Sequence, residues 1–245
     1  MAIRGVIFDL GSTLIHRTGL ELEREKCAAL AAFAREELGC RDPEALARTL
    51  LRLRLEAWRR AEEEQIEYPA ARSIGQALAA HGLPADPRTV QRAEVSFFAP
   101  EVRASRLYPG AQEVLDALAG MGLRLALISN ATSHQLVLDI ARKHGIVRYF
   151  DPLVTSAAFG RTKPHPSIFR HVLEAWNLPP HEVVMAGDTL GADILGAHSV
   201  GLRSILVDIE PNPDNSRFED RVRPSARVRD LWEIPELVRL WSDSP

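Results

Sequence analysis

The sequence has little of several features that would place it in a specialised class of protein. Its two cysteines, Cys27 and Cys40, are too few for a disulfide framework and lack the spacing of a metal-binding motif. No apolar run approaches the roughly 20 residues that a membrane-spanning helix requires. Arg4 and Asp9 interrupt the apolar start of the chain, which argues against a signal peptide. We therefore expect a soluble cytoplasmic protein with no membrane partner.

The sequence also lacks an excess of charge of either sign. The 30 lysine and arginine residues are offset by 33 acidic residues, which gives a formal net charge of -3. A nucleic-acid-binding domain normally carries a basic excess clustered on one face, so we expect no nucleic-acid partner. Lysine itself is scarce. It stands only at Lys26, Lys143 and Lys163, so each of these is examined for a function.

The second half of the sequence alternates between two kinds of segment. Short apolar runs, which predict buried strands, alternate with amphipathic segments of helical length. This alternation predicts βαβ units and a parallel sheet. Strands are expected near 6–8, 125–129, 152–155, 183–187 and 204–207, and helices near 110–121, 133–144, 166–176, 192–199 and 234–241. Residues 209–224 are expected to be a loop.

The segment between the first strand and residue 105 has a different pattern. Four helices are expected there, over 21–38, 43–64, 69–81 and 87–98, with Asp-Pro pairs that begin the second and fourth. The predicted fold is thus α/β, a Rossmann-like doubly wound parallel sheet in which residues 1–15 and 106–245 form the core and residues 16–105 an inserted all-helical cap domain. An insert at this point emerges beside the carboxyl end of the first strand and is expected to cover it.

Four predicted strand ends carry residues suited to chemistry. Alone, each has a plain interpretation: an aspartate that caps a turn, a hydroxyl bonded to backbone, or a surface lysine. The carboxyl ends of strands in an open α/β sheet meet at one crevice, where such folds bind ligands, so we expect these residues to converge. The candidate residues are Asp9, Ser129, Asn130, Lys163, Asp188 and Asp193.

This set suits phosphoryl transfer to a carboxylate nucleophile. Asp9 and Asp188 would hold Mg²⁺, which prefers oxygen ligands. Lys163 would neutralise phosphoryl charge and Ser129 would donate a hydrogen bond, while Asp193 would orient Lys163 or a metal-bound water.

With these motifs, the chain resembles the haloacid dehalogenase superfamily of hydrolases, in the subgroup whose helical cap follows the first strand. The matching segments are 9–14, Ser129, Lys163-Pro164, Gly187-Asp188 with Asp193, and Tyr108-Pro109-Gly110. The Gly-Asp pair is typical of the family's Mg²⁺-dependent phosphatases, whereas true dehalogenases usually differ there. The resemblance implies an aspartyl-phosphate at Asp9 and a small phosphorylated metabolite as the substrate.

The resemblance also implies supporting roles around the nucleophile. Ser129, Asn130 and Lys163 would bind the phosphate, and Asp9, Asp188 and the carbonyl of Gly11 would bind the metal. Thr13 and Asp193 would support these groups. Gly11 departs from the pattern, because the family's phosphatases carry there a second aspartate that acts as general acid and base. General acid–base catalysis contributes about 10²–10⁴-fold, so poor leaving groups should be affected most.

Several alternatives stay open at this point. His16, Ser12, a cap residue such as Glu21 or a metal-bound water could replace the missing acid, although a place in the hinge that leads to the cap is the more common role for a residue such as His16. Arg59, Arg60 and Arg72 could contact an anionic substrate or simply face solvent, and His165 and His198 are expected in loops or on the surface. The protein could instead be a metal-independent dehalogenase-like hydrolase, or a binding protein with weakened catalysis. It could be a monomer or a homodimer.

Overall fold

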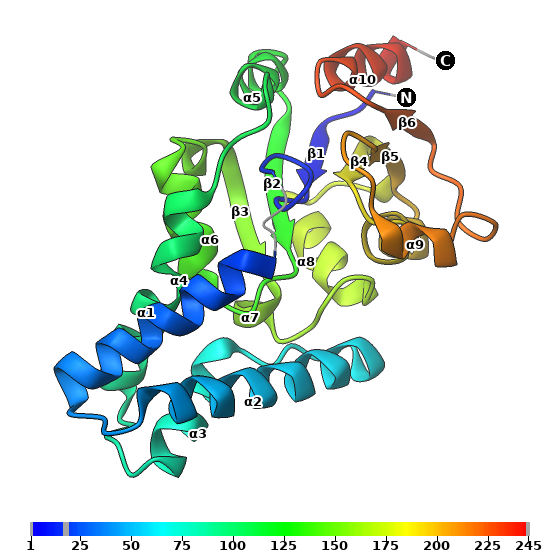
Figure 1. Ribbon diagram of the computed structural model, residues 1–245. Helices are drawn as coiled ribbons and strands as arrows, with labels where there is room; N and C mark the ends of the chain where they lie inside the picture. Colours follow the sequence, from blue (N-terminus) through cyan, green and yellow to red (C-terminus); the bar gives the residue numbers. More distant parts are fainter. Residues whose placement is uncertain (1, 17–19, 244–245) are drawn as a thin grey trace.

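The computed structural model describes residues 2–16 and 20–243. In this part of the chain a parallel sheet of six strands has the order β3-β2-β1-β4-β5-β6 (Figure 1). The strands are β1 (Gly5–Phe8), β2 (Arg124–Ser129), β3 (Phe150–Thr155), β4 (Val183–Gly187), β5 (Arg203–Val207) and β6 (Ala226–Val228). The helices are α1 (Leu20–Leu38), α2 (Pro43–Glu64), α3 (Ala70–Ala80), α4 (Pro87–Ala104), α5 (Ala111–Gly120), α6 (His134–Lys143), α7 (Ser156–Phe159), α8 (Pro166–Trp176), α9 (Leu195–Ser199) and α10 (Glu233–Asp243). None of the helices in the described ranges is both long and apolar enough to span a bilayer.

The sheet is covered by helices on both faces, because successive side chains of a strand point to opposite sides. Val6 and Phe8 of β1 belong to the apolar cluster that includes α5, α6 and α10. Ile7, between them, packs instead in a second cluster with α8 and α9. This is the doubly wound arrangement that the alternating sequence predicted.

The strand order places β1 at the centre of the sheet. From β2 the chain proceeds outward to β3, then crosses to the other side of β1 and continues through β4, β5 and β6. The order therefore reverses beside β1, and in open α/β sheets the crevice at such a switch point is where ligands bind. Asp9 directly follows β1 at this point.

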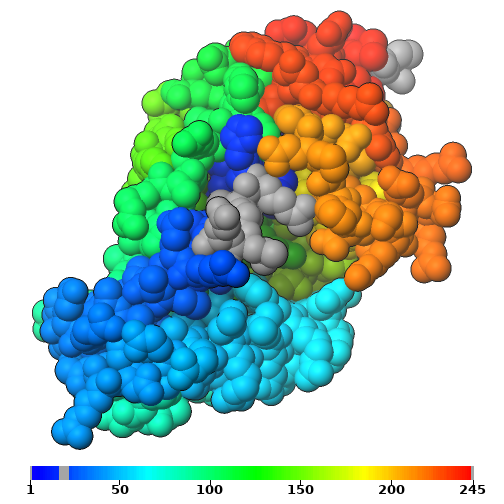
Figure 2. Space-filling model, in the orientation of Figure 1, coloured from blue at the N-terminus to red at the C-terminus, as the bar shows by residue number. Residues whose placement is uncertain are grey.

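The inserted segment consists of α1 to α4. α1, α2 and α3 lie below the carboxyl edge of the sheet in Figure 1, and α1 and α2 form much of the lower part of the surface in Figure 2, while α4 packs against α1 and against α6. Asp42 and Asp86 begin α2 and α4 as predicted, and each accepts hydrogen bonds from backbone N–H groups of the first turn. The buried side chains of these helices include Leu30, Leu50 and Phe97.

The structure differs from the sequence prediction in several places, and the short helix α7 was not predicted. Helix α4 continues through Pro100 to Ala104, although an internal proline removes a helical hydrogen bond, because Phe97, Phe98 and the proline itself are buried. The stretch expected to be a loop contains a 3₁₀ turn at Pro213–Arg217, and β6, which was not predicted, follows it. β6 has only three residues, and its pairing with β5 carries no local sequence signal.

Candidate active site

The candidate nucleophile is fixed to the centre of the sheet. Its backbone N–H donates to the carbonyl of Ala186 at 2.9 Å, which joins the end of β1 to the end of β4. The turn that follows places Ser12 at φ 58°, in the left-handed region, and its N–H donates to Ile15. Asp9 is only 7% exposed. The carboxylate is therefore buried at the switch point of the sheet.

Three aspartates meet at this point. Asp9, Asp188 and Asp193 each offer a carboxylate oxygen, and these oxygens lie within 4.8 Å of one another. The ammonium of Lys163 lies 2.6 Å from Asp9 and 2.7 Å from Asp193. The three carboxylates and one ammonium leave an excess of negative charge in a buried space.

The excess negative charge is reflected in the titration of the cluster. Burial raises the pKa of Asp188 above the usual range, and the charges of Asp9 and Asp193 raise it further. Burial also raises the pKa of Asp193, against the opposing effect of Lys163. Burial lowers the pKa of Lys163, but the two aspartates outweigh this effect and raise the pKa overall, so the lysine stays charged. Such a cluster favours a second cation.

Lys163 is held in place from the end of β2. Its ammonium donates to the carbonyl of Ile128 at 2.7 Å. The Nδ2 of Asn130 donates to the backbone carbonyl of Lys163 at 2.9 Å. The Oδ1 of Asn130 accepts from the backbone N–H of Lys163 at 2.8 Å. Asn130 thus positions the lysine, and its expected contact with phosphate stays a prediction. Ser129 is buried on the same strand end and lines the adjoining cavity.

Asp193 reaches back toward β4 from a π-helical turn at Leu190–Ile194. Its carboxylate accepts from the N–H of Thr189 at 3.0 Å and pairs with Lys163, the contact that the sequence predicted. A Cβ atom at Gly187 would lie 2.4 Å from this carboxylate, so only glycine leaves room for it. The glycine before Asp188 therefore has a steric role in the site.

Two residues of the site were missed from the sequence. Asn212 donates to the Asp188 carboxylate at 2.7 Å, and Asn215 donates to the Asp188 carbonyl while accepting from Leu190 N–H. Both lie in the segment expected to be a loop. The Asn-Pro pair at Asn212-Pro213 is a helix-start signal that could have indicated order there.

The remaining candidates lie around this cluster. The Thr13 hydroxyl is buried and has no hydrogen-bond partner among the described residues. The ring of His16 contacts that of Tyr108 in a tilted arrangement, with centroids 4.1 Å apart, and its Nδ1 lies 2.9 Å from Glu210. His16 thus joins the cap linker to the loop after β5. The side chain of Glu21 lies outside the described residues, so no replacement acid is identified.

A cavity of about 250 Å³ lies between the cap and the core. It is lined by Gly11, Ser129 and Asn130 from the core and by residues of α1, α2 and α4 from the cap. Arg59, Arg60 and Arg72 are exposed and do not line it, and Arg60 instead pairs with Glu64 at 3.1 Å.

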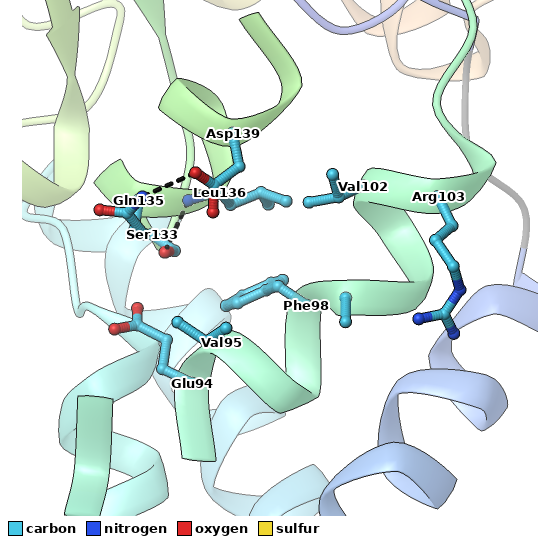
Figure 3. Close-up of a pocket in the computed structure, with 10 residues that line it drawn as sticks. Glu94, Val95, Phe98, Val102, Arg103, Ser133, Gln135, Leu136 and Asp139 are labelled. Atoms are coloured by element: carbon cyan, nitrogen blue, oxygen red, sulfur yellow. Dashed lines mark hydrogen bonds between the residues drawn. The ribbon is translucent and has the colours of Figure 1, made fainter. Parts of the chain in front are cut away.

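A second cavity, between α4 and α6, shares two side chains with the first. Figure 3 shows Phe98 and Leu136 in its wall beside Val95 and Val102. Glu94 points toward it from α4, near Ser133 at the start of α6. Unlike the first cavity, it is not lined by Gly11, Ser129 or Asn130, so it does not adjoin the candidate active site.

The histidines expected in loops or on the surface have structural contacts. His165 caps the start of α8 and lies 2.7 Å from the hydroxyl of Ser167. His198, on α9, lies 2.8 Å from the hydroxyl of Ser204 on β5.

The profile of the haloacid dehalogenase-like hydrolase family matches residues 3–201, and the chain belongs to this family. In sequence it is 38% identical over 130 residues to haloacid dehalogenase-like hydrolase domain-containing protein 3 of Xenopus laevis, covering 53% of this chain and 46% of that protein. It is 31% identical over 184 residues to the phosphoserine phosphatase of Thermus thermophilus, covering 74% of this chain and 66% of that protein. The chain thus spans about half to two thirds of the length of these relatives.

The fold itself is matched by solved structures. The 2-haloacid dehalogenase of Pseudomonas syringae superposes with a TM-score of 0.72 over 98% of this chain and 99% of that one, at 24% identity. This likeness confirms the predicted α/β fold with its helical insert.

Proposed function

We propose that the protein is a Mg²⁺-dependent phosphomonoesterase that acts on a small phosphorylated metabolite through an aspartyl-phosphate at Asp9. The observation that carries the proposal is the buried cluster of Asp9, Asp188 and Asp193 with Lys163. The name of the Thermus thermophilus relative supports phosphate chemistry on a small metabolite. In this proposal residues 16–105 are the cap, and residues 1–15 and 106–245 are the core.

The residues present fit a hard divalent cation. Their donors are carboxylate oxygens, which Mg²⁺ prefers, and their excess negative charge is only partly neutralised by Lys163. Asp9, Asp188 and the backbone carbonyl of Gly11 would hold the ion, with Asp193 in support. When bound, the ion supplies positive charge that offsets repulsion between the nucleophile and a phosphate dianion.

In the proposed mechanism, side chains of this protein carry out the phosphoryl transfer itself. A carboxylate oxygen of Asp9 attacks phosphorus in line, and the bond from phosphorus to the leaving oxygen breaks. Lys163 and Ser129 bind the phosphoryl oxygens during transfer. Water then hydrolyses the aspartyl-phosphate, which releases inorganic phosphate and restores Asp9.

Replacement of the nucleophile tests the proposal. Asp9→Asn should lower Mg²⁺-dependent hydrolysis of p-nitrophenyl phosphate by on the order of a thousandfold or more, as removal of a nucleophile generally does. EDTA should abolish wild-type activity, and added Mg²⁺ should restore it. Asp220→Asn, at an exposed aspartate, is the matched control and should keep full activity. Unchanged turnover in Asp9→Asn would disprove the mechanism, and full activity on 2-haloacids in EDTA would favour a dehalogenase.

A further inference from the structure

The cavity between the cap and the core is placed to hold the part of a substrate that leaves with the ester oxygen. Its core side is formed by the residues next to the nucleophile and by Ser129. Its other walls come from cap and core helices and combine apolar side chains, among them Trp58, Phe98 and Leu136, with charged side chains of α1, α2 and α4. A phosphoryl group at Asp9 would therefore direct its leaving group into this space.

One cation in the wall of this cavity is buried without a direct ion pair. Arg54, on α2, is only 3% exposed, and no carboxylate among the described residues lies within ion-pair distance of its guanidinium. The Nη1 of Arg54 donates to the Thr132 hydroxyl over a long distance of 3.4 Å. Its Nε has no hydrogen-bond partner among the described residues. A buried charge with an unused donor is costly unless another group pairs with it.

The other cation of the cavity, Lys26, lies between two glutamates, and the net negative charge of these three groups balances Arg54 only from a distance. The ammonium of Lys26 lies 2.5 Å from Glu23 and 2.9 Å from Glu101, both of which also line the cavity. These two glutamates favour the charged form of Arg54 from a distance, whereas burial lowers its pKa. Arg54 is thus the described cation of this wall that is left available for a ligand.

The surroundings of Arg54 hold its guanidinium in one position. The Cζ atom of Arg54 lies 4.8 Å from the ring centroid of Trp58 and 4.9 Å from that of Phe97, in the range of cation–π contacts. Thr132, which it contacts, belongs to the core loop that follows Ser129 and Asn130. A planar guanidinium fixed in this way presents parallel N–H donors that match a carboxylate.

We infer that Arg54 selects substrates whose leaving group carries a carboxylate, so that the substrate class is small phosphorylated acids. This inference rests on the proposed function, because it assigns the far end of the same substrate. The phosphoryl group lies at Asp9 and Lys163, and the carboxylate lies at the cap.

A pair of matched esters tests this selectivity. Phosphoglycolate carries a carboxylate where 2-hydroxyethyl phosphate carries an uncharged alcohol. With Mg²⁺, the wild type should show a kcat/KM at least tenfold higher for phosphoglycolate. Arg54→Gln should reduce this ratio to near one, mainly through a higher KM for phosphoglycolate. Arg54→Lys should restore part of the ratio, because it returns the charge without the planar pair of donors. Arg59→Gln, at an exposed arginine on the same helix, is the control and should keep the wild-type ratio.

The outcomes separate the two proposals. Turnover of p-nitrophenyl phosphate by the wild type, together with a ratio that Arg54→Gln leaves unchanged, would overturn the inference and keep the phosphatase. If the wild type hydrolyses no phosphate ester, the proposed function fails, and calorimetry then decides on Arg54. Phosphoglycolate should bind Asp9→Asn at least tenfold more tightly than it binds the same variant carrying Arg54→Gln, provided that thermal unfolding shows both to be folded. Equal binding would overturn the inference.

Discussion

Gly11 is the residue at which this site departs from the phosphatases it resembles. A Cβ atom built on Gly11 meets nothing within 4 Å, and the residue is exposed. A side chain therefore fits there, and its absence is not required by packing. In the proposed mechanism the leaving group departs without a proton from this position, so turnover depends on how stable the leaving oxyanion is.

Restoring an acid at this position should accelerate the slow substrates. Gly11→Asp should raise kcat/KM for alkyl phosphates by about a hundredfold, within the usual range for a general acid, and change p-nitrophenyl phosphate little. Gly11→Asn is the matched control, since it has the same shape but cannot donate the proton. Rates of the wild type should also fall steeply as the leaving-group pKa rises. A flat dependence would show that another residue supplies the proton.

The sequence could predict the charged residues of the site better than the residues that hydrogen-bond to them. Asp9, Lys163, Asp188 and Asp193 were predicted to converge because parallel strands end at one edge, and the structure brings them together. Asn212 was not predicted, because its contact with Asp188 depends on how the loop after β5 returns to the end of the neighbouring strand β4. Such a contact has no period or spacing in the sequence.

At the level of elements, prediction was best where local signals mark both ends. Helix α8 begins at Pro166, directly after its N-cap residue His165. It ends before Asn177, whose backbone is in the left-handed region, and both limits agree with the prediction. Helix α4 was predicted too short because Pro100 is locally a helix breaker, and only its buried position explains why the helix continues. The errors thus arise where tertiary packing overrides local preference.

Helix α4 also carries an acidic group that should make stability depend on pH. Burial raises the pKa of Glu94, and a hydrogen bond from Ser133 opposes this only in part. The folded state therefore holds the proton more tightly than the unfolded state. Stability is highest below the unfolded pKa and falls as pH rises through the folded pKa.

Replacement of this glutamate should remove that pH dependence. Glu94→Gln should match the wild type in free energy of unfolding at a pH well below the unfolded pKa of glutamate, about 4.3, and should become the more stable protein as pH rises toward neutrality. Urea unfolding at a series of pH values measures the difference. Glu25→Gln, at an exposed glutamate on α1, should show no such trend. A constant difference between wild type and Glu94→Gln across pH would contradict the prediction.

At the scale of the molecule, the cap and the core share one apolar cluster. Buried residues of the cap, including Leu30, Leu50 and Phe97, belong to the same cluster as Phe8 and Val114 of the core. Apolar contact therefore continues from the helical insert to one face of the sheet. We expect the two parts to unfold together.

A substitution in the cap should accordingly weaken the whole protein. Leu50→Ala removes a fully buried side chain from α2 and should lower the free energy of unfolding by about 2–5 kcal/mol. Far-ultraviolet circular dichroism and tryptophan fluorescence should still report one common transition in urea. Leu51→Ala, at the exposed neighbour, should change stability by less than about 0.5 kcal/mol. Two separated transitions would show that the cap unfolds on its own.

The central position of β1 has a consequence for synthesis of the chain. Gly5 pairs with Arg124 on one side and with Val183 on the other, so β1 is made long before either of its neighbours in the sheet. The cap helices, by contrast, are close together in sequence and can associate earlier. The apolar strand that ends in Asp9 therefore stays unpaired until β2 has been made, about halfway along the chain, and an unpaired apolar strand exposes the nascent chain to aggregation during this interval.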